Sequence, residues 1–401
     1  MRLFGVALVA TLLCVAQSAV AGVDELAVGG RFMWDATAWS GVEKETDGAW
    51  NDVSFVNGTE TRNARVFLKG KVYENLNFKV VYDFADGDEI ALKDAYLDLV
   101  GVPGVGNVRV GQFLEPLCMN AITSSKCISF VEGASLTAFA PSRNAGLMVH
   151  DKVAGGRLNY EVGLFLDTGD MAEKEGDDDY SVAARLACLV AGEEMSRRVL
   201  HVGAALNYFV PGGGVQYSQR PEVHLSDRLV DTGTIMNAET VLRYGGELAG
   251  VFGSLHVSGE YMVAGVTKSD ESAPVEARGD TWLADDGSFA GYYAEAGYFL
   301  TGEHRTYKDG FWDRTKPDSN FLKDGGLGAW EVLARYSSLD LNDDGAEIYG
   351  GKMDNVTLGL NWYLHSNARL MFNYVMSSVT DHDDEDVGKA NAFTMRTQFD
   401  F

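Results

Sequence analysis

The residues with the clearest capacity for chemistry in this sequence are cationic. Arg62 and Arg65 lie at the start of a segment in which polar and apolar residues alternate. Lys126 and Arg143 lie in a long segment without clear alternation. A guanidinium offers planar, paired hydrogen-bond donors and stays charged, which suits phosphate. Six further cations lie on the polar side of alternating segments and could form a basic track beside water: Lys69, Lys71, Lys79, Arg157, Arg185 and Arg335.

Carboxylates lie on the same polar side of the alternating segments. They are Asp94, Asp98, Glu161, Glu247, Glu260, Glu295 and Glu331. Mixed signs across a water-filled passage set up a transverse field, which favours general selectivity over a dedicated anion filter. The whole chain carries a formal net charge of −25. Such acidity argues against nucleic acid or anionic lipid as partners that are recognised through charge.

Patterns typical of enzymes and metal sites do not occur in the sequence. The seven histidines are scattered without ligand spacing, and there is no nucleophile elbow, phosphate loop or dinucleotide fingerprint. A barrel lipase would need a Ser/His pair, and His256 and Ser258 share one strand face, but their neighbours are ordinary strand residues. We therefore expect no enzyme activity, no cofactor and no metal.

Period-two alternation dominates the chain after residue 21 and predicts β-strands with one apolar and one polar face. Sixteen runs can be counted: 31–40, 64–73, 77–84, 90–100, 107–113, 145–151, 156–166, 180–190, 198–210, 241–252, 255–263, 290–300, 328–338, 353–364, 368–378 and 390–401. No later apolar run is long enough for a spanning helix, so a membrane would be crossed by a closed barrel. The sequence predicts an all-β fold, a transmembrane antiparallel β-barrel of about 16 strands.

The connections between these runs alternate in length, as they do in outer-membrane barrels. Tight turns are marked by Asn75, Gly155–Gly156, Gly253–Ser254 and Ser366–Asn367. The long polar segments are 41–63, 114–144, 167–179, 211–240, 264–289, 339–352 and 379–389. Residues 301–327 break this pattern, because they are long yet fall on the side of the short turns. A missed strand pair there would raise the count to eighteen.

Both ends of the chain carry export signals. Residues 1–21 combine Arg2, an apolar stretch and the small-residue pattern Ala19-Val20-Ala21, which predicts a cleaved signal peptide and a barrel domain over 22–401. The last run alternates up to Phe401, and a terminal aromatic resembles the signal that the barrel assembly machinery reads. Of the cysteines beyond the signal, Cys118 and Cys127 could pair in an oxidising compartment, or all three could stay free.

Several stretches, in order along the chain, resemble the phosphate-selective porin O and P family. They are Leu92–Leu97, Gly111–Phe113, Glu115-Pro116, Thr123-Ser124-Ser125-Lys126, Ala138–Pro141 with Arg143, Arg220–Glu222, Val230–Gly233, Gly259–Met262, Leu300–Glu303, Gly328–Glu331, Leu339–Asp343 and Leu360–Tyr363. The resemblance implies a trimeric sixteen-stranded porin whose third outer loop folds into the lumen and narrows it. The strand count independently identifies residues 114–144 as that third loop.

The resemblance and the charge pattern together suggest a substrate and ion pathway. We expect it to include Arg62, Arg65, Asp94, Ser124, Ser125, Lys126 and Arg143. The sequence departs from the family at Asn63, Leu114, Gly133 and Asn144, where the family pattern typically has a basic residue. These departures leave phosphate selectivity open.

The predicted function is an outer-membrane porin of the Gram-negative type, a water-filled channel for passive diffusion of small hydrophilic solutes. Selectivity for anions or phosphate remains one alternative, and a plugged or structural barrel without an open pore remains another. The expected partners are outer-membrane lipid and lipopolysaccharide, small hydrophilic or anionic solutes, two further copies in a homotrimer, and the barrel assembly machinery through Phe401. Nucleic acid is not an expected partner.

Overall fold

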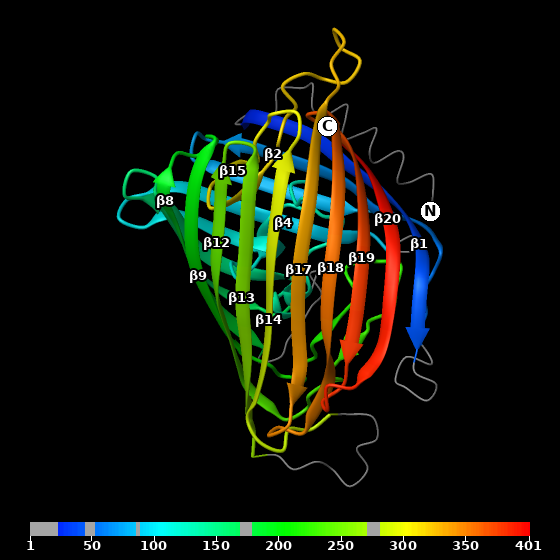
Figure 1. Cartoon of the computed structure of the whole chain (residues 1–401). Helices are drawn as coiled ribbons and strands as arrows, with labels where there is room; N and C mark the ends of the chain where they lie inside the picture. Colours follow the sequence, from blue (N-terminus) through cyan, green and yellow to red (C-terminus); the bar gives the residue numbers. More distant parts are fainter. Residues whose placement is uncertain (1–22, 45–52, 86–88, 169–178, 271–280) are drawn as a thin grey trace.

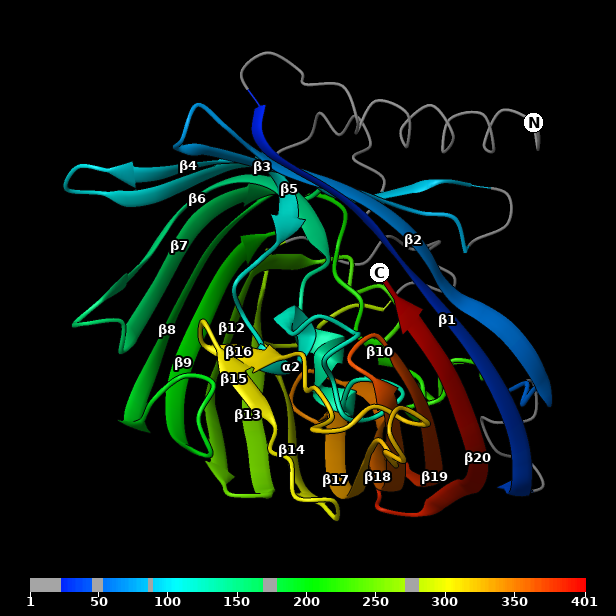
Figure 2. The ribbon, with the colours of Figure 1, turned by 90° about the horizontal axis from the view of Figure 1, so that it is seen from above.

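The computed structural model describes residues 23–44, 53–85, 89–168, 179–270 and 281–401. The predicted signal peptide, residues 1–21, lies outside the described residues and stays a prediction. Sixteen antiparallel strands form one closed barrel (Figures 1 and 2). Among the described residues, no helix is long and apolar enough to cross a membrane.

Each of the sixteen predicted runs overlaps one barrel strand, so the predicted strand count is confirmed. The strands are β1 (Val23–Lys44), β2 (Gly58–Val72), β3 (Leu76–Asp83), β4 (Ala91–Val102), β5 (Gly106–Leu114), β6 (Arg143–Val153), β7 (Leu158–Leu166), β8 (Tyr180–Gly192), β9 (Arg198–Val210), β12 (Ala238–Phe252), β13 (Leu255–Lys268), β14 (Gly287–Phe299), β17 (Ala329–Asp343), β18 (Ile348–His365), β19 (Ala368–Thr380) and β20 (Asp386–Asp400). Strands β1 and β20 pair and close the ring, with Phe32 opposite Phe399.

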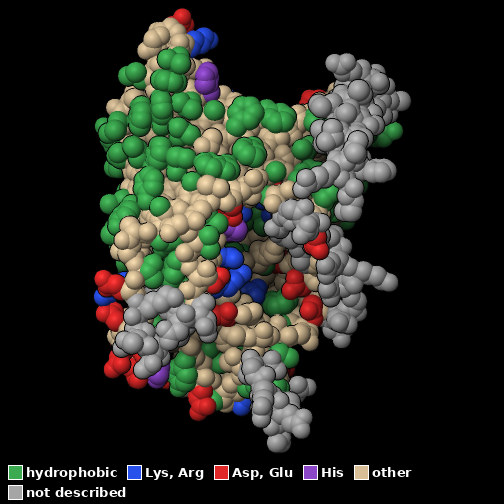
Figure 3. All heavy atoms as spheres, turned by 90° about the vertical axis from the view of Figure 1, so that its right-hand side faces the viewer, with side chains coloured by type: hydrophobic (Ala, Val, Ile, Leu, Met, Phe, Trp, Pro, Cys, Tyr) green, Lys and Arg blue, Asp and Glu red, His purple; other side chains and the backbone are tan. Residues whose placement is uncertain are grey.

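The alternating apolar and polar residues of the sequence face the outside and the inside of the barrel, respectively. On β9, Val202 and Leu206 are exposed outward, whereas His201 and Asn207 are fully buried inside. Figure 3 shows the result as a broad band of apolar side chains on the outer surface, with charged side chains gathered toward one end. An outward apolar band and a polar interior are what a strand between lipid and water requires.

We call the end of the barrel that carries the short connections and Phe401 the turn end (top in Figure 1), and the opposite end the loop end. Phe401 is held at the turn end by two backbone hydrogen bonds with Gly30, each 3.1 Å. The chain therefore uses its last residue to complete the pairing of β1 with β20.

Two long connections from the loop end fold into the barrel. Loop 3 (residues 115–142) contains the single-turn helix α2 (Met119–Ile122) and the short 3-10 helix η1 (Ser135–Phe139). It runs through the middle of the ring in Figure 2. Loop 5 (residues 211–237) contains the small strands β10 (Ser218–Gln219) and β11 (Val230–Asp231) and packs on loop 3, with Tyr217 against Phe139. The expected inward third loop is thus present.

The irregular segment 301–327 also folds inward, from the turn end. It forms a hairpin of β15 (Thr306–Lys308) and β16 (Phe311–Asp313) that is a separate two-stranded sheet. Tyr307 and Trp312 of this hairpin are buried against Met119 of loop 3. The extra strand pair exists, but it does not join the wall, so the barrel has sixteen strands and not eighteen. We call residues 300–328 turn 6.

Candidate functional site

Loop 3 is fixed at its start by buried hydrogen bonds. The Glu115 carboxylate accepts bonds from Asn144, Ser181 and Asn207 at 2.7–2.8 Å. Burial raises the pKa of this carboxyl group. Glu260 of β13 accepts the backbone N–H groups of Met119 and Asn120, both at 2.8 Å. These anchors hold the α2 side of loop 3 against the wall formed by β8 to β14.

A second anchor holds the far side of loop 3. The Glu132 carboxylate lies between the guanidinium groups of Arg62 and Arg396, at 2.8 and 2.7 Å. Burial raises the pKa of Glu132, but the two guanidinium charges outweigh burial and hold it well below its usual range. Arg62 reaches this position because β1 and β2 change register between Met33 and Trp34, which leaves Arg62 as the extra residue of a bulge.

Between the two anchors, loop 3 turns the segment Ser124–Lys126 toward β1. The Arg31 guanidinium donates to Ser125 Oγ at 2.5 Å and to Ser124 Oγ at 2.8 Å. Its Nε is buried without a hydrogen-bond partner. Among the described residues, no carboxylate lies within ion-pair distance of Arg31. Arg31 is therefore a partly buried cation that forms no ion pair with a described carboxylate, although the charge of Asp83 acts on it from farther away.

The wall beside Arg31 carries more positive than negative charge. Arg65 pairs with Asp83 at 2.7 Å. Lys79 and Arg143 share one carboxylate, Asp94, each at 2.6 Å.

We call the set Arg31, Arg65, Lys79, Asp83, Asp94 and Arg143 the exposed wall. The side chains of Lys79 and Arg65 are 35% and 17% accessible, so water and solutes can reach them. Arg65 and Arg143 also lie close enough to Arg31 for their charges to interact. The exposed wall thus brings together two carboxylates and four cations.

Lys126 lies beside the exposed wall, on the side of the turn end. Its ammonium group is 3.7 Å from Asp400 of the closing strand. Burial, and then the charge of Arg314 in turn 6, lower the pKa of Lys126 to about 8. Lys126 is therefore positively charged at neutral pH but loses its charge in mild alkali.

The opposite wall of the barrel also carries arginines and carboxylates, but there they form buried ion pairs. The Arg185 guanidinium bonds Glu247 at 2.5 Å and Glu161 at 3.1 Å, and its side chain is 1% accessible. Arg335 bonds Glu222 of loop 5 at 2.5 Å. We call the set Arg185, Glu247, Glu295, Glu331 and Arg335 the buried wall. Of the six cations on the predicted basic track, Arg185 and Arg335 thus lie in enclosed ion pairs.

The predicted pathway residues divide into two groups. The structure brings Arg65, Asp94 and Arg143 into the exposed wall, and Ser124, Ser125 and Lys126 face that wall or its turn end. Arg62 is occupied by Glu132 and supports loop 3 instead.

The sequence analysis did not single out Arg31. The available signal was its position on the polar face of the first strand, directly opposite Arg65 in the register. Two of the departures from the family pattern are structural residues here. Asn144 bonds Glu115, and Asn63 lies 3.5 Å from Asp83. Cys118 and Cys127 are buried and free.

A closed sixteen-stranded barrel with an apolar outer band and an inward third loop is the architecture of an outer-membrane porin of Gram-negative bacteria. The family model described as phosphate-selective porin O and P matches residues 26–401. The chain belongs to this family.

Relatives and solved structures agree with that assignment. Porin O of Pseudomonas aeruginosa is 25% identical over 413 residues, which cover 93% of this chain and 88% of that protein. An uncharacterized protein of Caulobacter vibrioides is 30% identical over 328 residues, 79% of this chain. The matched region spans only 62% of the Caulobacter protein. The anion-selective porin of Comamonas acidovorans superposes with a TM-score of 0.54, 14% identity and coverage of 94% of this chain and 99% of that one, which shows a shared fold.

Proposed function

We propose that the protein is a diffusion channel that favours small anions, with its selectivity set between loop 3 and the exposed wall. The observation that carries this proposal is Arg31, whose guanidinium has two serine partners, one unsatisfied Nε and no ion pair with a carboxylate of the described residues. A passing anion would supply the missing counter-ion. Charge at a narrow, water-filled passage is what sets ion selectivity in such pores.

Two further observations support anions over cations as the favoured solutes. Lys79 and Arg143 both contact Asp94, each at 2.6 Å, so two cations lie beside this carboxylate. The family description and the name of the Comamonas porin refer to phosphate and to anions in those proteins. Asp83 and Asp94 still add negative charge to the passage, which favours general anion selectivity over tight phosphate binding.

Reversal potentials in planar bilayers under a KCl gradient test this proposal. The wild type should favour chloride, and Arg31→Gln should move the reversal potential toward potassium. Arg228→Gln is the matched control, because Arg228 lies exposed in loop 5 and bonds only Ser218. A cation-selective wild type would refute the proposal. A correctly folded barrel without conductance would instead support a plugged or structural barrel.

We also propose that the mature protein starts at Gly22 and assembles as a homotrimer through the side that carries β1. The side facing the viewer in Figure 3 is hollowed below the apolar band, and Lys, Arg, Asp and Glu side chains gather there. Charge is costly against lipid, so a second copy is a better neighbour for this hollow. Intact mass and cross-linking of protein extracted from membranes would test both points. A retained residue 1 or a monomer would contradict them.

A further inference from the structure

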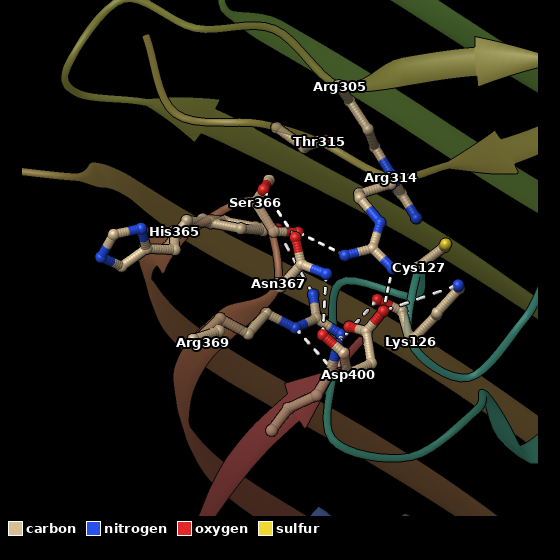
Figure 4. A pocket seen from close by; sticks show the side chains of 13 residues that line it. Lys126, Cys127, Arg305, Arg314, Thr315, His365, Ser366, Asn367, Arg369 and Asp400 are labelled. Carbon is tan, nitrogen blue, oxygen red and sulfur yellow. Dashed lines mark hydrogen bonds and ion pairs between the residues drawn. The ribbon is translucent and has the colours of Figure 1, made fainter. Parts of the chain in front are cut away.

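A second cluster of cations lies at the turn end, away from Arg31. A small pocket forms where loop 3, turn 6 and the ends of β18, β19 and β20 meet (Figure 4), with a volume of about 20 Å³. That volume holds about one water-sized group. Four cations and one carboxylate line it: Lys126, Arg305, Arg314, Arg369 and Asp400.

The only lining carboxylate already has two partners. Arg314 donates to Asp400, and the Lys126 ammonium lies 3.7 Å from the same carboxylate. Figure 4 shows these side chains and Arg369 turned toward one another around the pocket. Asp400 alone therefore leaves the lining with an excess of positive charge.

Two buried guanidinium groups border the pocket, one hydrogen-bonded only to uncharged groups and the other with one unsatisfied nitrogen. Arg369 is 3% accessible, yet its hydrogen-bond partners are the uncharged Gln398 and the Tyr363 hydroxyl. Among the described residues, no carboxylate lies within ion-pair distance of Arg369. Arg305, also 3% accessible, bonds Glu295 through Nη1 but leaves its Nε without a partner. An unpaired charge in a buried position is costly, and a bound anion would remove that cost.

We propose that this pocket is an anion-binding site, whose enclosed part takes an oxygen of a carboxylate or phosphate while the rest of the anion lies in its open part. Guanidinium groups suit such ligands because they donate two parallel hydrogen bonds. The pocket would hold an anion at the turn end after it has passed loop 3. Lys126, which lies between Arg31 and Arg314, would connect the two sites. The inference does not depend on the proposed selectivity, because none of the pocket residues belongs to the exposed wall.

The position of the pocket indicates a soluble anion and not a lipid headgroup. Gln398 and Asp400 point inward from the closing strand, whereas their neighbours Phe399 and Phe401 are exposed on the outside. Residues of loop 3, which lies inside the barrel, form another side of the pocket. A headgroup would have to pass through the wall to reach Arg369.

A phosphate-binding experiment tests the site. Inorganic phosphate is added to the purified full-length protein in detergent, and binding is measured as broadening of the ³¹P NMR line. All variants in this experiment should also carry Arg31→Gln, because that substitution removes the proposed loop 3 site. In that background phosphate should still bind, and adding Arg369→Gln should weaken binding about tenfold, as expected for loss of a charged hydrogen bond. Acetate should compete with phosphate for the pocket.

Two variants control for folding and for general charge. Arg369→Lys keeps the charge and should retain most of the binding, and heat-modifiability on gels should confirm that each variant is folded. Lys308→Gln removes an exposed cation from the same turn and should change nothing. Equal binding by Arg369→Gln and Lys308→Gln, or no phosphate binding in the Arg31→Gln background, would overturn the pocket. Binding that depends on Arg369 in a channel without anion preference would support the pocket and refute only the proposed selectivity.

Discussion

The two walls of this barrel carry the same types of charged residue, but these residues are enclosed in ion pairs on one wall and accessible on the other. On the buried wall, Arg185 and Arg335 are each held by carboxylates and are almost inaccessible to water. On the exposed wall, Arg65 and Lys79 remain accessible, and Arg31 forms no ion pair with any carboxylate in the part of the chain that the structure describes. The residue type therefore does not decide the role of a charge in the barrel. Loop 3 contacts both walls, so the difference lies in loop 5 and turn 6, which supply Glu222 and the Gly310 carbonyl to the buried wall.

This difference follows from how the inner segments are anchored. Loop 3 is tied to β13 through Glu260 and to β19 through Asn373, which accepts the Val131 N–H at 2.7 Å. Loop 5 contributes Glu222 to Arg335, and the Gly310 carbonyl of turn 6 accepts a hydrogen bond from Arg185 at 2.6 Å. These contacts lie on the side of β8 to β19, whereas the exposed wall lies on β1 to β6.

The largest effect is expected from breaking the buried wall. Arg185→Leu removes the cation between Glu161 and Glu247 and leaves the enclosed Glu247 carboxylate without it. Loss of one partner of a buried pair costs about 3–5 kcal/mol. Urea unfolding of the refolded barrel should show this loss, whereas Lys79→Gln on the exposed wall should cost less than about 1 kcal/mol. Equal losses for the two variants would erase the distinction between the walls.

A large change in selectivity, with little change in stability, is expected from the exposed wall and loop 3. Lys126→Ala combined with Arg143→Ala removes two cations near the narrowing and should shift the reversal potential toward cations. The local potential changes strongly because the groups are confined and poorly screened. Wild-type selectivity in this double variant would show that loop 3 does not contribute to the filter.

A smaller effect is expected from pH. Because the pKa of Lys126 is lowered to about 8, its ammonium is charged below that pH and neutral above it. Anion preference should therefore fall as the pH rises from 7 to 9, measured as reversal potential under a fixed KCl gradient. Lys126→Gln should flatten this dependence. A preference that grows with pH would contradict the assignment.

The smallest effect is expected at the rim of the loop end. Asp383, Asp384 and Glu385 lie in the exposed turn between β19 and β20, and Asp383 is 73% accessible. Salt screens such charges beyond about 8–10 Å. Neutralising all three should leave the reversal potential nearly unchanged at 0.15 M salt. A shift as large as that of the Lys126 and Arg143 double variant would locate the filter at the rim.

The sequence predicts those features of the fold that depend on local periodicity. The sixteen strands and the inward third loop were predicted because alternation and loop length are visible along the chain. It raised a strand pair in residues 301–327 but could not place it outside the wall, since its strands have only three residues each and are stabilised by contacts with distant residues such as His201, bonded to Tyr307 at 2.7 Å. It overlooked Arg31 and expected Arg62 in the pathway, because the register opposite Arg65 and the bulge at Arg62 are set by pairing between strands.

The most direct test of the two-wall account compares two variants of opposite sign on the exposed wall. Reversal potentials should be measured under one KCl gradient for Arg31→Gln and Asp94→Asn. The account predicts a shift toward cations for Arg31→Gln and a shift toward anions for Asp94→Asn, because both groups border the passage. Shifts in the same direction, or no shift in either variant, would show that ions do not pass along this wall.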